Sequence, residues 1–329
     1  MLRITGSFLA VLLVFGCAQL QKARKTDRDP TTGTRPIQTG PALPGPVTAQ
    51  QPLPPLDSCV KPVEDNSRIK ISPRDVIVAV DSSGSHRIAL SAKAETRLAG
   101  GLNPDLKDKT LRFLVAGQIA GGATTNDNGV ATLTVDVPLT PMTVTCYEAE
   151  HEGFRMPGRI FALPSNQSFF VSDIDEVISD LPEIRVPITS IPDSPVVPQA
   201  PETLRELSKS FVIVYLTARD DALANKTRSW LKYRDFPSGP LKIWNWTSTN
   251  GFGSSQEQQG AYKRAFLTEL KKTFPRLVAG IGNRVHDATA YKDVGLLPII
   301  INPKDSKASF PQGTVFVESW KDVLQVARP

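Results

Sequence analysis

The sequence predicts two folded regions in tandem: an all-β immunoglobulin-like sandwich, followed by an α/β domain with a doubly wound parallel sheet. Between residues 63 and 164, short runs of alternating apolar and polar residues are separated by turn-forming residues, which is typical of sandwich strands. Between residues 165 and 329, unbroken apolar runs alternate with helix-like segments. Strands of this kind are buried on both faces, as in a parallel sheet covered by helices. A chain of 329 residues is long enough for two domains.

The N-terminal residues indicate export and a lipid anchor. A positively charged residue precedes an apolar run, residues 7–16, that is too short to span a bilayer comfortably. The run ends in LVFGC, which resembles a bacterial lipobox, so we expect residues 1–17 to be a lipoprotein signal peptide with lipidation at Cys17. A plain secretory signal with an incidental cysteine is the alternative. The next residue is Ala18 and not Asp, which favours the outer membrane, facing the periplasm, over retention in the inner membrane.

Residues 18–62 predict a disordered tether, because proline recurs and apolar periodicity is almost absent. The formal net charge of the chain is +5, and no basic run is interleaved with aromatic residues. This pattern argues against nucleic acid as a partner and leaves a weak preference for anionic surfaces such as phospholipid headgroups. The oligomeric state is left open.

The cysteines beyond Cys17 are Cys59 and Cys146, which bracket most of the first folded region. In an exported chain two such cysteines can form one disulfide, and two unpaired buried thiols are the alternative. The chain has three histidines and no cluster of cysteine with histidine, so a zinc site is not expected.

The predicted sandwich strands carry alternating or β-branched residues, and turns rich in Gly, Asn, Asp or Pro separate them. The letters NDNG at 126–129 predict a hairpin turn that leads into a strand. Nothing in this region predicts catalysis. The predicted strands span residues 75–81, 87–96, 110–117, 131–138 and 142–150.

The α/β domain is predicted from strands and helices in alternation. The Pro-rich segment 177–211 is long enough for a flap but short for a cap domain, so an open site is expected. The predicted strands span residues 168–172, 210–217, 240–246, 276–282 and 296–302, and the predicted helices span 221–235 and 258–274.

Polar side chains follow several of these strands where they end. In an open parallel sheet, ligands bind outside the carboxyl ends of the strands, so these side chains are candidates for one site. A carboxylate can act as a nucleophile toward phosphorus, and a second carboxylate can move the proton of the leaving group. A hydroxyl and a lysine can hold phosphate oxygens, and a third carboxylate can help to hold Mg²⁺. The candidates are Asp173, Asp175, Thr217, Lys263, Asn283 and Asp287.

Three stretches resemble motifs of the haloacid dehalogenase superfamily, most closely those of the lipin branch of Mg²⁺-dependent phosphatidate phosphatases. They are SDIDEV at 172–177, FPSGPLKI at 236–243 and GIGNRVHDATAYKDVGL at 280–296. The last is the most specific, because a lone D-x-D is common. The resemblance covers about residues 165–305 and implies a haloacid dehalogenase-like fold without a large cap.

The resemblance also implies a role for each candidate. Asp173 would be the nucleophile, and Asp175 the general acid and base. Thr217 and Lys263 would bind phosphate. The metal site for Mg²⁺ would consist of Asp173, Asp175 through its backbone carbonyl, and Asp287.

Two further motif residues have implied roles around that site. Asn283 would support the metal ligands without touching the ion, and Arg284 would contact phosphate or form a structural salt bridge. The chain departs from the motif at Glu176, where Gly or Asp is usual, and at Val177, which replaces Thr.

The expected function is that of a phosphoric monoester hydrolase that converts phosphatidate to diacylglycerol and phosphate through an aspartyl-phosphate. A phosphatase of another exported phosphoester is one alternative. A non-catalytic lipid-sensing module is the other.

Overall fold

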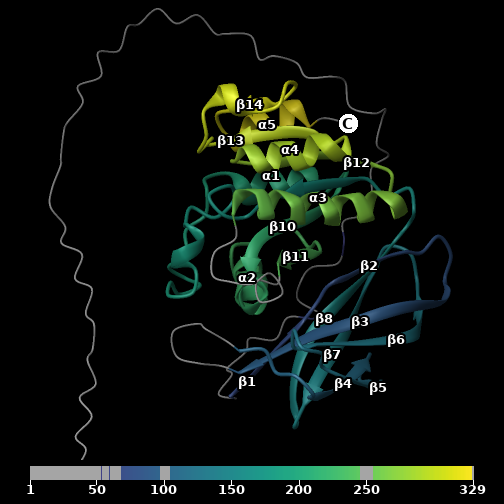
Figure 1. The fold of residues 1–329 in the computed structure, drawn as a ribbon. Helices are drawn as coiled ribbons and strands as arrows, with labels where there is room; N and C mark the ends of the chain where they lie inside the picture. The colour runs from purple at the N-terminus through teal and green to yellow at the C-terminus, as the bar shows by residue number, and fades with distance from the viewer. Residues whose placement is uncertain (1–52, 54–58, 60–67, 97–103, 245–254, 328–329) are drawn as a thin grey trace, which may run out of the picture. The chain divides into compact units, whose positions relative to one another are not determined.

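The computed structural model describes residues 68–96, 104–244 and 255–327, together with Leu53 and Cys59 (Figure 1). The predicted signal peptide, residues 1–17, lies outside the described residues, and so does nearly all of the predicted tether, residues 18–62. None of the described helices has the length and apolar character needed to cross a membrane.

The first described region consists of strands alone. In chain order they are β1 (Ile69–Pro73), β2 (Val76–Ala79), β3 (Gly84–Thr96), β4 (Thr110–Val115), β5 (Gln118–Thr124), β6 (Val130–Leu139), β7 (Thr143–His151) and β8 (Phe154–Leu163).

These strands form two sheets over one core. One sheet has the order β1-β3-β6 and is antiparallel, and the other has the order β2-β8-β7-β4-β5, antiparallel except for the β2–β8 pair. Leu90 of the first sheet and Phe113 and Tyr147 of the second belong to the same buried cluster. The region is therefore a two-sheet β-sandwich, and the immunoglobulin-like type stays a prediction.

Strands β1, β5 and β8 were not among the predicted strands. β5 lies at the edge of its sheet and contains Gly121 and Gly122, which weaken a strand pattern. β8 contains Pro157 and Gly158 in its first half, and its partner β2 pairs only with residues 160–163. A Cβ atom at Gly158 would lie 2.4 Å from the ring of Tyr147, so the glycine makes room for that ring.

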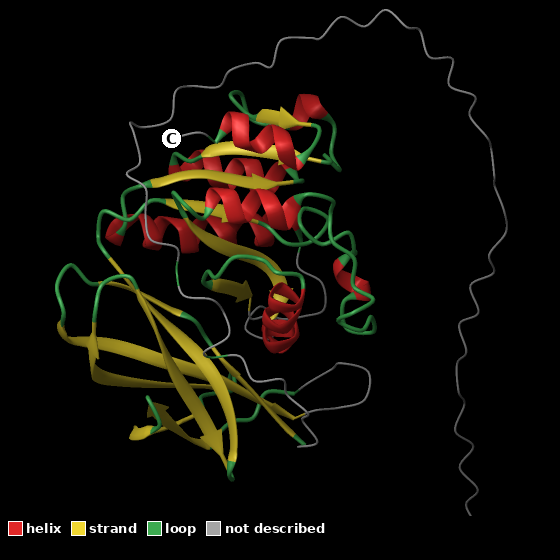
Figure 2. Ribbon diagram, turned by 180° about the vertical axis from the view of Figure 1, so that it is seen from behind, coloured by secondary structure: helices red, strands yellow, loops and turns green. Residues whose placement is uncertain are grey.

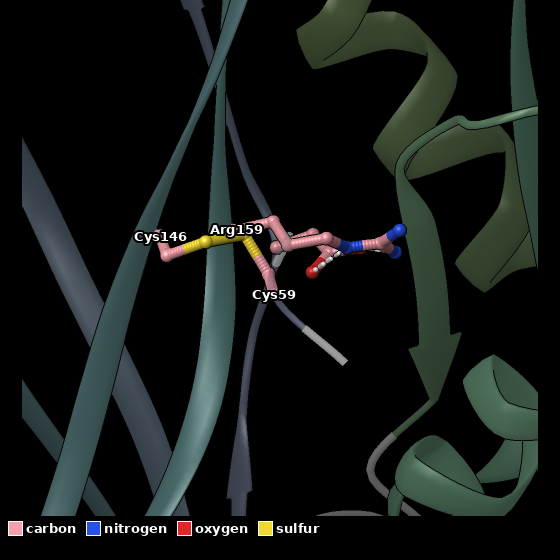
Figure 3. Close-up of a disulfide and its surroundings, with 4 residues drawn as sticks. Cys59, Cys146 and Arg159 are labelled. Atoms are coloured by element: carbon pink, nitrogen blue, oxygen red, sulfur yellow. Dashed lines mark hydrogen bonds and ion pairs between the residues drawn. A yellow bond between two sulfur atoms is a disulfide. The ribbon is translucent and has the colours of Figure 1, made fainter. Parts of the chain in front are cut away.

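Cys59 and Cys146 form a disulfide bond that joins the segment before β1 to strand β7 (Figure 3). Arg159 of β8 lies directly opposite Cys146 in the register of β7 with β8. Figure 3 shows the Arg159 side chain extending away from the disulfide.

The second described region alternates strands and helices. Its strands are β9 (Phe169–Ser172), β10 (Val212–Asp220), β11 (Leu241–Trp244), β12 (Leu277–Gly282), β13 (Leu297–Ile301) and β14 (Val315–Val317). Its α-helices are α1 (Ala200–Leu207), α2 (Ala224–Tyr233), α3 (Gln256–Thr273), α4 (Val285–Val294) and α5 (Trp320–Val326), and its short 3₁₀ helices are η2 (Glu183–Arg185), η3 (Asp221–Leu223) and η5 (Lys307–Ser309).

The six strands form one parallel sheet in the order β11-β10-β9-β12-β13-β14, with helices on both faces. Alternate residues of β9 point to opposite faces. Phe170 packs in the cluster that includes residues of α1, α2 and α5, whereas Phe169 and Val171 pack with residues of α3 and α4. Figure 1 shows α3 and α4 on the near side of the sheet, and Figure 2 shows the molecule from behind. The predicted parallel α/β sheet is confirmed.

Local sequence sets where helices α3 and α4 begin or end, and both helices border the candidate active site. Ser255 caps the start of α3, where its side chain accepts a hydrogen bond from the backbone N–H of Gln258. Helix α4 ends at Gly295, whose φ of 80° is in the left-handed region that glycine adopts most easily. Helices α1, α4 and α5 were not predicted. Pro201 at the start of α1 is compatible with a helix N-terminus, although the segment reads as Pro-rich.

The sandwich packs directly against the α/β region. Asp75, from the sandwich, is buried and paired with Arg159 of β8 and with Arg228 of α2. Its carboxylate also accepts a hydrogen bond from the backbone N–H of Leu241, at 2.8 Å. Phe161 of β8 shares an apolar cluster with residues of α3. Both regions belong to one compact unit, residues 38–329.

A second buried polar group links the regions around Lys93 of β3. Its ammonium nitrogen lies 3.0 Å from a carboxylate oxygen of Glu95, 2.9 Å from one of Asp105 and 3.1 Å from one of Asp221. Burial raises the pKa of Glu95 to about 7, since the lowering by the Lys93 charge is smaller and the charges of Asp221 and Asp220 add to the rise.

We expect Glu95→Gln to change how stability depends on pH. The protonated Glu95 side chain favours the folded state, so its contribution is complete below about pH 4.5 and is lost as the pH rises through about 7. Glutamine does not titrate. The free energy of unfolding of the variant, relative to wild type, should therefore rise by on the order of 3 kcal/mol between pH 4.5 and pH 8. Denaturant unfolding of both proteins across this pH range measures the difference in unfolding free energy. A difference that stays constant with pH would contradict the expectation.

Candidate active site

The first candidate residue, Asp173, follows β9 at the carboxyl edge of the sheet. Its backbone N–H donates to the carbonyl of Ile281 in β12 at 3.0 Å, so two adjacent strands fix its position. One carboxylate oxygen, Oδ1, accepts from the backbone N–H of Ile174 at 2.8 Å. The side chain is buried, and its other oxygen is left to face the neighbouring helix α3.

Lys263 of α3 lies between two of the candidate carboxylates. Its Nζ is 2.9 Å from Oδ2 of Asp173 and 2.6 Å from Oδ1 of Asp287, and the lysine side chain is 1% exposed. Lys263 lies well inside α3, and its side chain reaches the carboxyl edge of the sheet beside Asp173.

Burial dominates the electrostatics of this group. It raises the pKa of Asp173, and the charges of Asp287 and Asp175 add to the rise while the Lys263 ammonium opposes it. Burial acts in the same direction on Asp287, but there the Lys263 and His286 charges outweigh it and hold the pKa below its usual value. One ammonium thus serves two buried carboxylates, which leaves this part of the site with an excess of negative charge.

Asp175 takes part in a separate ion pair. The guanidinium of Arg219 lies 2.8 Å from its Oδ1, and Nε of Arg219 is 3.0 Å from both carboxylate oxygens. The Thr217 hydroxyl donates to Oδ2 of Asp175 at 3.2 Å and is itself fully buried within β10. Thr217 therefore orients the Asp175 carboxylate, in addition to the phosphate role that the resemblance implies.

Asn283 and Asp287 lie where β12 passes into α4. One oxygen of Asp287, Oδ2, accepts the backbone N–H groups of Asn283 at 3.2 Å and Arg284 at 3.1 Å, which caps the helix. The Asn283 amide donates to the backbone carbonyl of Asp175 at 3.3 Å. Arg284 lies 3.7 Å from Asp305, so of its two expected roles the structure contains the salt bridge.

Glu176 has a backbone φ of 57°, in the left-handed region. This conformation explains why glycine is usual at the position, because a side chain there is strained. The Glu176 carboxylate forms an ion pair with Lys304 at 2.6 Å, which draws it to the loop after β13. The departure from the motif is thus accommodated by a charge partner.

The donor set suits magnesium. Asp173 and Asp287 offer carboxylate oxygens and Asp175 offers its backbone carbonyl, and Mg²⁺ prefers such oxygen ligands. Burial is the main cause of the raised pKa of Asp173, and the charges of Asp287 and Asp175, which a cation would offset, add to the rise. These three residues would hold the ion.

A tighter acidic cluster lies elsewhere. Among the described residues, one group of three acidic side chains has its ligand atoms within 4.8 Å of one another: Glu95, Asp220 and Asp221. Lys93 already lies in that cluster, so it is not the predicted magnesium site.

Sequence patterns did not single out Arg219, His286 or Glu183. Arg219 stands two residues after Thr217 on β10, so the two side chains point to the same face of the sheet. This two-residue spacing is the feature of the sequence that could have indicated Arg219. His286 lies 3.4 Å from Asp287 and precedes it directly in the chain. Glu183, in the segment after β9, interacts with the charges of Asp175 and Arg219, and no local pattern marks it.

Residues 170–301 match the family model described as "PITM 1-3, LNS2 domain". The matched range begins in β9 and ends with β13, so it contains the whole candidate site and leaves the sandwich outside. With the parallel sheet, this match supports a haloacid dehalogenase-like phosphatase fold for the α/β region. No curated protein matches the chain significantly.

Solved structures of phosphatases also match. A D,D-heptose 1,7-bisphosphate phosphatase from B. bronchiseptica, complexed with magnesium and phosphate, has 15% identity and a TM-score of 0.38 and covers 49% of this chain and 100% of its own. A haloacid dehalogenase-like family hydrolase from Streptococcus pneumoniae has 15% identity and a TM-score of 0.33, with 49% and 98% covered. Likeness at this level carries no conclusion about the substrate of the present chain.

Proposed function

We propose that the protein is a Mg²⁺-dependent phosphatase of phosphatidate or a similar phospholipid phosphomonoester. The observation that carries the proposal is the buried group Asp173–Lys263–Asp287 at the carboxyl edge of the parallel sheet. The match of residues 170–301 to the LNS2 domain model and the resemblance to lipin-type motifs support the reaction class and the lipid substrate.

The reaction proceeds in two displacements. An oxygen of Asp173 attacks the phosphorus, the bond to the alcohol oxygen breaks, and the leaving alkoxide takes a proton from the Asp175 carboxyl group. Water then attacks the aspartyl-phosphate, Asp175 takes the proton of the water, and inorganic phosphate leaves with the Asp173 carboxylate restored. Bound Mg²⁺ would supply charge neutralisation for the phosphoryl oxygens.

The remaining residues hold this arrangement. Lys263 keeps Asp173 in place and offers positive charge to the transferring phosphoryl group. Thr217 and Arg219 orient the Asp175 carboxylate.

A second candidate is a phospholipid-binding module without turnover. The observation that favours it is the Arg219–Asp175 ion pair, in which two guanidinium nitrogens hold the carboxylate that the reaction needs as an acid. In such a pair the Asp175 carboxylate serves as a structural partner of Arg219.

The proposed location is the bacterial cell envelope, with a lipid anchor at Cys17 in the outer membrane, facing the periplasm. LVFGC at the end of the apolar run supports this location. An anchored enzyme would meet a phospholipid headgroup in the plane of the membrane.

Phosphate release tests these alternatives. The full chain is given phosphatidate in mixed vesicles or a soluble phosphomonoester, each with Mg²⁺ and with a chelator. Preferred turnover of phosphatidate that disappears with chelator and returns with Mg²⁺ supports the proposal. Preferred turnover of the soluble ester points to another phosphoester, and vesicle binding without phosphate release points to the binding module. Turnover that persists in chelator would overturn the assigned metal site.

A further inference from the structure

Two isoleucines on the segment between β9 and α1 are left in solvent. Ile184 and Ile188 are each 84% exposed, more than any other large apolar side chain among the described residues. Tyr233, at the end of α2, is 56% exposed. Large apolar side chains that gather in solvent mark a contact surface more often than isolated ones do.

The same segment reaches the candidate active site on its other side. Leu181 and Val186 line a small cavity together with Arg219 and Thr227, so the segment packs on the residue that holds Asp175. Glu183, next to Ile184, is partly buried, and its Oε1 has no hydrogen-bond partner among the described residues. In Figure 2 the loop with this short helix lies on the side to which the strand arrowheads of the sheet point.

Helix α2 fixes the segment in this place. The Trp230 indole donates to the carbonyl of Ser194 at 3.0 Å, and the Arg234 guanidinium donates to the carbonyl of Pro192 at 2.7 Å. Lys226 donates to the carbonyl of Pro187 at 3.1 Å. These contacts hold the backbone, so the exposure of the isoleucines does not result from a loose loop.

Basic residues accompany the isoleucines on the segment and on the neighbouring helix. Arg185 stands between them in the chain, is exposed, and has no acidic partner among the described residues. Lys226 and Arg234 contact neutral carbonyls on this segment, so those bonds leave their positive charges uncompensated. The exposed acidic residues of the segment are Asp180 and Asp193, and Asp193 is engaged with Ser190. Exposed apolar side chains with lysine and arginine beside them suit an anionic phospholipid surface, where the apolar side chains enter the acyl boundary and the positive charges meet the phosphates.

We propose that the segment Glu183–Ile188, with the adjoining end of α2, docks on an anionic phospholipid bilayer through Ile184 and Ile188. Docking brings the edge of the sheet that carries Asp173 to the height of the headgroups, so a phosphomonoester lipid enters the site without leaving its membrane. The delivery of a lipid substrate to the site rests on the proposed function, but the docking itself does not depend on turnover.

The test separates docking from catalysis by using a lipid that carries no phosphomonoester. The full chain with Cys17→Ser, which cannot be lipidated at that position, is mixed with phosphatidylcholine vesicles that contain or lack phosphatidylglycerol, and the sedimenting fraction is measured. Adding Ile184→Ser and Ile188→Ser should weaken partitioning about tenfold or more. Arg185→Gln should weaken it on the anionic vesicles alone.

Ile119→Ser is the matched control, because Ile119 is also exposed but lies on β5 of the sandwich. It should partition like the parent chain, and turnover of a soluble phosphomonoester should be the same in all variants. Equal partitioning of the Ile184/Ile188 variant and its parent would overturn the docking surface. Loss of partitioning with phosphatidate turnover absent even in the parent would overturn the proposed function and leave the docking surface standing.

Discussion

Asp173→Asn is expected to lower phosphomonoester turnover by about ten-thousand-fold or more while the protein stays folded. The amide has nearly the shape of the carboxylate but does not attack phosphorus. The loss of charge should be tolerated, because burial already raises the pKa of Asp173 and disfavours its ionised form. Phosphate release under saturating Mg²⁺ measures the effect, and thermal unfolding verifies the fold.

Asp180→Asn provides the matched control. Asp180 belongs to the same segment of chain and is exposed, so the same substitution there should leave turnover and stability unchanged. A purified Asp173→Asn protein that releases phosphate at the wild-type rate would remove Asp173 from the mechanism.

Lys263→Met should have the largest effect on stability. It leaves Asp173 and Asp287 buried with no ammonium between them, and breaking a buried pair from one side costs about 3–5 kcal/mol. Turnover should also fall by about a thousandfold, since the phosphoryl group loses a positive partner. Denaturant unfolding is measured with chelator present, so that a metal ion does not take the place of the ammonium.

A double variant separates the effect of Lys263 on stability from its effect on turnover. Lys263→Met with Asp287→Asn removes one of the stranded charges, so stability should recover in part while turnover stays lost. Lys272→Met on the same helix is the control, because Lys272 is exposed in an ion pair with Glu269 and should contribute well under 1 kcal/mol. An unchanged unfolding free energy for Lys263→Met would mean that Lys263 does not stabilise the buried carboxylates of Asp173 and Asp287.

The sheet could be predicted because its strands are apolar on both faces. Phe169 and Phe170 point to opposite sides, and both are fully buried, so no alternation confuses the pattern. The candidate site could be predicted because spacing within a motif fixes Asp173 and Asp287 at neighbouring strand ends. Their joint contact with Lys263 follows from the position of α3 across the sheet.

The remaining features depend on contacts that are distant in sequence. Arg219 pairs with Asp175, 44 residues away, and its spacing from Thr217 gives its face of the sheet but not its partner. Strand β5 is glycine-rich and lies at an edge, so its pairing with β4 outweighs its weak intrinsic preference. The strained backbone of Glu176 is visible only once its φ and its partner Lys304 are known.

The carboxylate of Asp75 shows that the two regions are not separable parts of the chain. Arg228 lies on α2, the helix that also carries Trp230 and ends just before Arg234, and it reaches back across the boundary to an aspartate of the sandwich. Cutting the chain near residue 165 would remove the Asp75 partner of Arg228 and uncover the aromatic ring of Phe161. Folding cooperativity therefore extends across the change of fold class, and the sandwich supports the helix that holds the segment with Ile184 and Ile188 in place.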